Sequence, residues 1–343
     1  MAKSFMNQNL SLTVSSQSLS WRNLLSIRLL LMTVPLFLGT SYVAAKIGMQ
    51  DLLPLNLVIL RLIMASTAFA LVLFYRKQSS SIELKDIPQF LLLGFLAIAS
   101  FFYIHYTGLQ YTTSTNAGLI MAATPVFAAL FSILAKQKAV SSYSKLGIGI
   151  ALSGILLVIS QGRVTELFQQ KTLAGDGLLL LNALVWAALG VKGKTVLAKY
   201  SPFTAIAYLH IFGTLLLLPF ACIPSIFAPT PLLQQLPGIS STTLLISAYL
   251  AIFCSVYLYF IWYLGISRIG TVKTELFNYF NPIMASLAGI LLFHDKLTIS
   301  GALGGLLILF GVYITGENAP PSLHLIKCSP IKTKIPARFS KVL

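Results

Sequence analysis

The sequence predicts an all-α integral membrane protein with ten transmembrane helices, arranged as two inverted five-helix repeats. Three observations carry this prediction. Only 9% of the 343 residues are charged and 57% are hydrophobic, whereas soluble domains contain about 25% charged residues. The apolar residues fall in runs of about 20, the length that a helix needs to cross a bilayer. Gly, Pro and Tyr residues recur at a fixed offset between the two halves of the chain.

The formal net charge of +16 agrees with this fold class. In a soluble protein, clustered Lys and Arg would indicate nucleic-acid binding, because they release counterions from phosphates. Here the basic residues lie in loops between apolar runs, where they set topology and attract anionic lipid. We therefore expect a lipid bilayer as partner and no nucleic acid. The three cysteines have neither a CxxC spacing nor a metal-ligand grouping, so we expect no metal site. We also expect no cofactor.

Ten apolar runs with polar borders predict the membrane spans. In chain order they cover 27–47, 54–74, 87–109, 114–134, 144–161, 175–195, 202–223, 242–264, 273–293 and 298–316. The turns at 111–114 and 267–271 are short, so the helices on either side of each turn should be antiparallel neighbours. The rest of the chain is an N-terminal segment 1–26, a linker 162–174 and a basic tail 317–343.

The distribution of basic residues predicts the orientation. With the N-terminus in the cytoplasm, most lysines and arginines fall on the cytoplasmic side, and the opposite side holds Lys46, Arg163, Lys171 and Lys296. Because Lys and Arg near span ends stay inside, segments 1–26 and 317–343 are predicted to be cytoplasmic and linker 162–174 external. The first run is interpreted as an uncleaved span. A Ser-rich start without acidic residues leaves an organelle transit peptide as the alternative.

An internal repeat divides the chain into halves 27–161 and 175–316. A shift of 157 matches Tyr106 with Tyr263, Gly108 with Gly265, Pro125 with Pro282, Gly147 with Gly304 and Gly154 with Gly311, and a shift of 148 pairs Lys46 with Lys194 and Pro54 with Pro202. Five spans per half force the second half to enter the membrane from the other side. Inverted repeats of this kind are typical of secondary transporters, which open a midplane site to each side in turn.

Several short motifs at matching places in this duplicated frame support a family resemblance. They are Gly39-Thr40-Ser41-Tyr42, Pro54 with Arg61, Pro125, Asn281-Pro282, and Asp295 followed by Gly301, Gly304 and Gly311-Val312. From about Leu29 to Gly316 the chain resembles the drug/metabolite transporter superfamily, specifically ten-helix exporters with two EamA-type repeats. The sequence departs from that pattern at Leu38, where the family often has Trp, at Lys138, where it often has Glu, and at Asp295, which replaces the usual Glu.

Arg61 is the clearest ionisable residue within a predicted span, and a charge at that depth costs about 2.5 to 3.5 kcal/mol on translocon scales. It has two interpretations. A structural Arg61 would hydrogen-bond to backbone carbonyls or extend toward the interface. A functional Arg61 would bind an anionic substrate group through paired hydrogen bonds.

Glu275 is a carboxylate at the start of the predicted ninth span. Near a helix N-terminus it is stabilised by the helix dipole, or it couples transport to protons through a pKa raised by desolvation. Asn278, Tyr279 and Pro282 follow it on much the same helical face. This polar face is expected to look into the protein, and protons are the candidate coupling ion.

Aromatic and polar residues in other spans are candidates for lining a substrate cavity. They are Tyr42, Tyr103, Tyr106, Asn182, Trp186, Tyr257 and Trp262. Interfacial placement is the alternative for the aromatic ones, and His105 and His210 are expected to be neutral and hydrogen-bonded. Pro125 and Pro282 are predicted to kink matching helices and to act as hinges. Gly147, Gly149, Gly301, Gly304 and Gly305 predict close helix packing.

The leading functional hypothesis is a secondary transporter that exports a small metabolite, amino acid or drug-like compound by alternating access. The resemblance also leaves open an exchanger of organic phosphates or nucleotide sugars. An intramembrane enzyme is the remote alternative, and no GxSxG, HExxH or Walker A sequence supports enzymatic or ATP-driven chemistry. The expected location is a bacterial plasma membrane.

Overall fold

The computed structural model describes residues 21–76, 82–134, 142–192, 199–270, 273–274 and 276–317. Within these ranges the chain consists of helices and the turns that join them, with an isolated bridge between Ser225 and Ala228 but no β-strand. Eight helical segments are long and apolar enough to cross a membrane, and two shorter apolar helices cover Leu173–Ala188 and Ile299–Thr315. The all-α membrane fold is confirmed, and ten as the number of spans stays a prediction.

The helices follow the predicted runs closely. The first half contains α1 (Trp21–Gly48), α2 (Pro54–Arg76), η1 (Leu84–Asp86), α3 (Ile87–Gly94), η2 (Phe95–Ser100), α4 (Phe101–Gln110), α5 (Ser114–Met121), α6 (Thr124–Leu134) and α7 (Ser142–Ser160). The second half contains η3 (Val164–Gln169), α8 (Leu173–Lys192), α10 (Pro202–Cys222), α11 (Leu232–Gln235), η4 (Leu236–Gly238), α12 (Ser241–Ala251), η5 (Ile252–Tyr257), α13 (Leu258–Ile269), η6 (Leu276–Phe280), α15 (Asn281–Phe293) and α16 (Ile299–Glu317).

Local capping residues fix several helix starts. The side-chain oxygens of Thr113, Ser201 and Ser240 accept hydrogen bonds from amides three residues on, at 3.0, 3.1 and 3.2 Å. Each satisfies a donor that the first turn of a helix leaves without an intrahelical partner. These caps begin α5, α10 and α12.

Both halves contain a π-helical segment at the same place. The segment η2 interrupts the third predicted span and η5 interrupts the eighth. A shift of 157, the same shift that relates the sequence repeats, brings their bounds into register. π turns are rare and often mark functional sites. Their presence at equivalent positions shows that both repeats have the same irregularity.

Prolines interrupt the fourth and ninth predicted spans at matching places. The α5 helix ends at Met121, and α6 begins one residue before Pro125. In the second half α15 begins one residue before Pro282. Proline fits the first turn of a helix and cannot donate to a preceding turn. The expected interruptions are present, Pro125 on an exposed position and Pro282 on a buried one, and motion about them stays a prediction.

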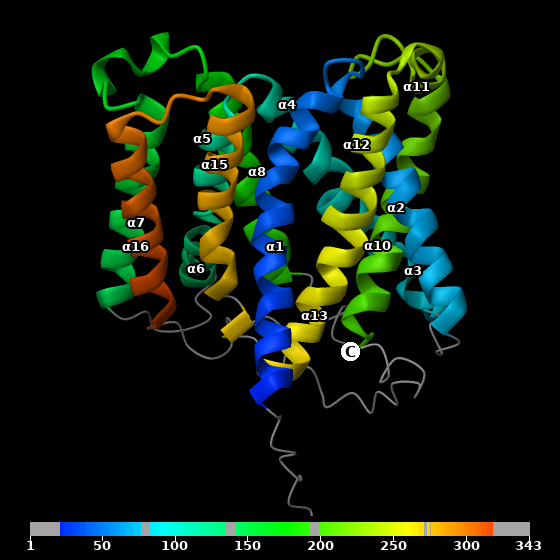
Figure 1. The fold of residues 1–343 in the computed structure, drawn as a ribbon, viewed down its shortest axis with the longest axis horizontal. Coiled ribbons are helices and arrows are strands. Elements are labelled where there is room, and N and C mark those ends of the chain that lie inside the picture. The colour runs from blue at the N-terminus through cyan, green and yellow to red at the C-terminus, as the bar shows by residue number, and fades with distance from the viewer. Residues whose placement is uncertain are drawn as a thin grey trace, which may run out of the picture.

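Glycine contacts join α7 and α16, which lie side by side at one end of the molecule (Figure 1). A Cβ atom added at Gly147 would lie 2.8 Å from the carbonyl oxygen of Gly311, and one at Gly154 would lie 2.6 Å from that of Gly304. Such distances leave room for hydrogen only. The packing prediction is therefore confirmed for Gly147 and Gly304, but Gly149 has no neighbour within 4 Å of an added Cβ.

The molecule has two faces that later sections compare. The terminal face is the one at which α1 begins and α16 ends, at the bottom of Figure 1. The loop face is the opposite one, and it carries the turn between α1 and α2 together with α11. In the predicted orientation the terminal face is cytoplasmic.

Candidate functional site

Arg61 lies at the centre of a polar cluster built by both halves. Its side chain is 4% exposed. Nη1 donates to Tyr106 Oη on α4 at 2.6 Å, and Nη2 donates to the Cys254 carbonyl at 3.3 Å and to Ser255 Oγ at 3.1 Å, both on η5. The guanidinium therefore ties α2 and α4 of the first half to the eighth predicted span.

The π segment explains why η5 can supply these partners. In a regular helix the carbonyl of one residue accepts from the amide four residues on, whereas a π turn shifts this pattern by one residue. Ser255 Oγ itself donates to the carbonyl of Leu250, five residues back, at 3.2 Å. Cys254 and Ser255 thus present two acceptors side by side to Nη2 of Arg61, which can donate to both because it carries two N–H groups.

The charge of Arg61 is met by neutral groups. Within the described ranges no Asp or Glu forms an ion pair with it. The Phe102 ring lies 4.1 Å from the guanidinium carbon, within cation–π range. The Nε atom of Arg61 is buried and has no hydrogen-bond partner. The cluster therefore contains a desolvated cation with one free donor, a state that costs free energy unless a ligand or water meets it.

A second part of the cluster joins α1, α4 and α8. Asn182 Nδ2 lies 3.2 Å from His105 Nδ1, and the ring of His105 lies 5.3 Å from that of Tyr42. Phe101 bridges to Trp186, with ring centroids 4.6 Å apart. The Oδ1 atom of Asn182 is buried without a partner. Three of the predicted cavity residues, Tyr42, Asn182 and Trp186, therefore gather around His105, whose sequence neighbour Tyr106 is the fourth and binds Arg61.

The other His predicted to be neutral is His210, whose ring centroid lies 6.4 Å from that of Phe102. His210 is fully buried, and its Nδ1 lies 2.9 Å from the carbonyl of Ile206. A carbonyl can only accept, so Nδ1 carries the proton and Nε2 is left as an acceptor, which has no partner. The expected hydrogen bond is present at one of the two ring nitrogens.

Three of the predicted residues lie away from this cluster. Tyr103 packs on Phe227, with ring centroids 5.4 Å apart. Tyr257 contacts Thr33 Oγ1 at 3.0 Å, and Trp262 packs in a separate small core between α1 and α13. They stabilise helix contacts around the cluster.

The predicted polar face of the ninth span is described only in part. Asn278 and Tyr279 are half-buried residues of η6, and Pro282 is buried at the start of α15. Asn281, just before Pro282, lies against the Tyr42 hydroxyl. Glu275 lies outside the described residues.

Sequence reasoning missed a group of aspartates that join the two halves. Asp176 on α8 is fully buried, and it accepts hydrogen bonds from Thr112 Oγ1 at 2.5 Å and from Asn116 Nδ2 at 3.3 Å. Asp51 and Asp295 make similar contacts in turns. The signal was available for Asp176, because the predicted sixth span begins at residue 175 and contains it.

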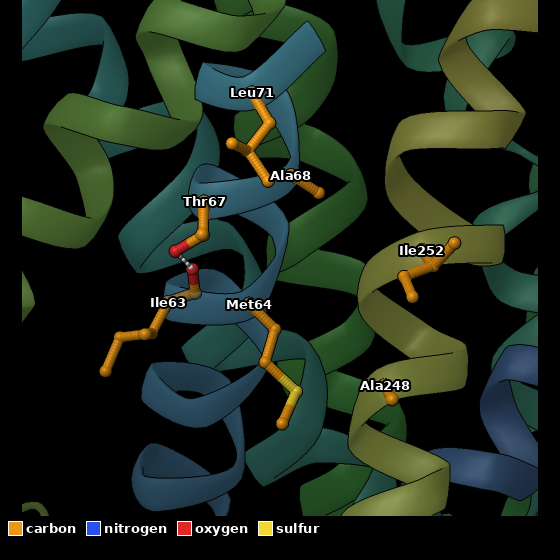
Figure 2. Close-up of a pocket in the computed structure, with 7 residues that line it drawn as sticks. All are labelled: Ile63, Met64, Thr67, Ala68, Leu71, Ala248 and Ile252. Carbon is orange, nitrogen blue, oxygen red and sulfur yellow. Dashed lines mark hydrogen bonds between the residues drawn. The ribbon is translucent and has the colours of Figure 1, made fainter.

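A groove of about 390 Å³ lies between α2 and the segment formed by α12 and η5, and it includes no residue of the Arg61 cluster. Its lining residues are Ile63, Met64, Thr67, Ala68, Leu71, Ala248 and Ile252, shown in Figure 2. The hydroxyl of Thr67 donates to the carbonyl of Ile63 at 2.9 Å. The groove therefore suits hydrocarbon, and the polar cluster is the better candidate for a polar solute. No group of three or more His, Cys, Asp or Glu suited to a metal occurs in the described part of the chain.

Comparison with known proteins gives consistent matches along the chain. The model of the EamA-like transporter family matches residues 25–160 and again 173–316. An uncharacterized transporter of Archaeoglobus fulgidus is 28% identical over 288 residues, which cover 84% of this chain and 96% of that protein. A probable amino-acid metabolite efflux pump of Escherichia coli is 25% identical over 281 residues, covering 80% and 90%.

A solved structure shares the fold. It is a crystal structure whose chain superimposes with a TM-score of 0.58 at 16% identity, and the match covers 84% of this chain and 96% of that one. The all-helical fold, the apolar spans and two family matches that together cover most of the sequence agree. The chain is a membrane transporter and belongs to the EamA-like transporter family, of which it carries two repeats.

Proposed function

We propose that the protein is a secondary exporter of a small metabolite that works by alternating access between two inverted five-helix repeats, 27–161 and 175–316. The observation that carries this proposal is the Arg61 cluster, which is buried and is formed by residues of both halves. A site of this kind opens to one side when the halves tilt one way and to the other side when they tilt back.

Amino-acid-like metabolites are the substrate class that we favour. Arg61 Nε is a free donor with a positive charge, while Asn182 Oδ1 and His210 Nε2 are free acceptors. A zwitterion offers a carboxylate to the first and an ammonium group to the others. The Escherichia coli relative is named as a probable amino-acid metabolite efflux pump, and this name supports the same class.

An exchanger of organic phosphates or nucleotide sugars is the second candidate. The lack of a carboxylate partner for Arg61 among the described residues favours it, because phosphate would supply the missing charge. Transport in proteoliposomes separates the two. We expect uptake of labelled amino acids, or of their metabolites, and competition by unlabelled ones. Competition by sugar phosphates alone would favour the exchanger, and no uptake of either class would contradict both.

The location and the coupling ion belong to the same proposal. We propose a plasma membrane with both termini cytoplasmic, protons as the coupling ion through Glu275, and no catalytic activity. Cysteines at Gln169 and Gln234 should react with an impermeant thiol reagent added from outside, and a cysteine at Gln78 should not. The reverse pattern would overturn the orientation. Glu275→Gln should abolish the response of transport to an imposed pH gradient, and an unchanged response at normal yield would leave Glu275 a structural role.

A further inference from the structure

The two halves are tied together at the loop face by three carboxylates, which we call the loop-face ties. These are Asp51, Asp176 and Asp295, and each accepts hydrogen bonds from residues of the opposite half. None of them forms an ion pair with a described lysine or arginine. Each tie therefore depends on hydroxyl, amide and backbone donors held in place by the other half.

Asp51 caps a helix of the second half. Its Oδ2 accepts from Ser240 Oγ and Thr243 Oγ1, both at 2.6 Å, and from the Ser240 amide at 3.0 Å. Ser240 is the N-cap residue of α12. A carboxylate at this position satisfies free amide donors and interacts favourably with the helix dipole.

Asp176 and Asp295 hold the start of α5 from the second half. Asp295 Oδ2 accepts from the amide and the hydroxyl of Thr115, at 3.1 and 3.2 Å. Asp176 binds Thr112 and Asn116 on either side of it. The α5 helix leads to the break before Pro125, so these two ties fix one arm of an interrupted helix.

The terminal face has a matching tie with different chemistry. Asp86 accepts from Lys199 Nζ at 3.0 Å and from Tyr200 Oη at 2.6 Å. Shifts of 148 and 157 place Lys199 at the position of Asp51 and Asp86 at that of Thr243. The repeat thus places a tie between equivalent positions at each face. At the loop face the carboxylate Asp51 binds Thr243, and at the terminal face their counterparts Lys199 and Asp86 form an ion pair.

We propose that these ties are the gates of the transporter: the loop-face ties close the loop face, the Asp86–Lys199 pair closes the terminal face, and transport breaks the two sets in alternation. This rests on the alternating access proposed above. The reason is geometric, since every tie joins one half to the other and the halves cannot separate at a face while its ties remain. A gate made of several hydrogen bonds to one carboxylate opens in a single step, because the bonds to that carboxylate are lost together when the opposite half moves away.

Reversible cross-linking tests the gates. In a background of Cys222→Ser and Cys328→Ser, the pair Asp51→Cys with Thr243→Cys would be bridged by a short bifunctional methanethiosulfonate. We expect transport in proteoliposomes to stop and to return with dithiothreitol, while a monofunctional reagent on the same pair has little effect. The pair Asp86→Cys with Lys199→Cys should behave alike. Undiminished transport by bridged protein would overturn the gates, whereas failure of the wild-type protein to transport would count against the proposed function.

A second measurement does not depend on paired cysteines. Ser247 is fully buried on α12, one turn beyond Thr243. Ser247→Cys should react about tenfold faster with an impermeant reagent applied at the loop face when Asp51→Asn is added. The amide oxygen still accepts the hydrogen bonds from Ser240 and Thr243, but it lacks the charge that strengthens them, and a weaker tie shifts a two-state equilibrium toward the open state. Asp86→Asn is the matched control and should slow the reaction. An unchanged rate in folded Asp51→Asn protein would overturn the loop-face gate.

Discussion

The two halves of the molecule share a scaffold but differ in chemistry. The π segments η2 and η5 and the prolines Pro125 and Pro282 occupy matching positions. Arg61, in contrast, corresponds to Leu209 at the shift of 148. The frame is therefore duplicated, while Arg61 is the one buried Lys or Arg among the residues that the structure describes. A duplicated frame provides two equivalent conformations, and a single polar cluster can present the same ligand contacts in both.

Replacement of Arg61 should have the largest effect on stability and transport. Arg61→Leu removes three hydrogen bonds and leaves the buried Tyr106 hydroxyl and Cys254 carbonyl without the hydrogen bonds that Arg61 donates to them. We expect a loss of about 3 kcal/mol in the free energy of unfolding and no transport. The matched change in the other half, Leu209→Met, should cost less than about 1.5 kcal/mol. Unfolding in detergent and uptake in proteoliposomes measure both, and equal effects would remove the asymmetry.

The π segments allow a sharper test, because Ser255 in η5 corresponds to Ile98 in η2 at the shift of 157. Ser255→Ala removes the 3.1 Å hydrogen bond from Arg61, and we expect it to lower stability by about 1.5 kcal/mol. Ile98→Val should lower it by about 1 kcal/mol. The two changes lower stability by similar amounts, so a difference in transport rate between the variants reports on the role of Ser255 in transport. We expect such a difference. Similar rates would indicate that η5 has a purely structural role.

The prolines test whether the duplicated frame moves symmetrically. Pro125→Ala and Pro282→Ala each restore an amide donor at a helix interruption, and the change in stability should stay within about 1 kcal/mol. We expect slower transport at normal protein yield in both, with the larger loss for buried Pro282. Wild-type transport by both variants would remove the hinges.

The last test concerns Asp51 at the loop face and uses its pH dependence. Hydrogen bonds from the Ser240 and Thr243 side chains and from the Ser240 amide lower the pKa of Asp51 to about 2. Because the pKa is depressed, this contribution to stability is present above about pH 4, the unfolded pKa, and is lost as the pH falls through 2. Wild type and Asp51→Asn should therefore differ in unfolding temperature at pH 7, and the difference should shrink as the pH falls from about 4 and vanish near pH 2. A constant difference would show that Asp51 does not titrate in this range.

Much of the frame could be predicted from sequence because it depends on local signals. Apolar runs, a proline at the start of α2 and a repeated spacing of Gly and Pro place the helices within a few residues. The π segments could not be predicted in this way, because an extra residue per turn inside a continuous apolar run leaves no polar marker. The count of spans depends on how the two shorter helices cross the bilayer, which residue composition alone does not fix.

The candidate site was predicted less completely. Arg61 stood out because an isolated charge in an apolar run is conspicuous, and Tyr42, Tyr106, Asn182 and Trp186 do gather near it. Its partners Cys254 and Ser255 are ordinary small residues, made special only by the backbone of η5. Tyr257 and Trp262 resembled cavity residues by type, yet they pack against α1, since periodicity does not tell which neighbour a helix face meets.

The contacts between α7 and α16 have a consequence for how the two repeats pair. Gly147 meets Gly311 and Gly154 meets Gly304. At the shift of 157, Gly304 is the counterpart of Gly147, and Gly311 that of Gly154. The two contacts are therefore exchanged copies of one another, which is the rule for an isologous dimer interface. The seam between α7 and α16 is therefore self-complementary, so one repeat and a second, oppositely oriented copy of it can pair through the same surface.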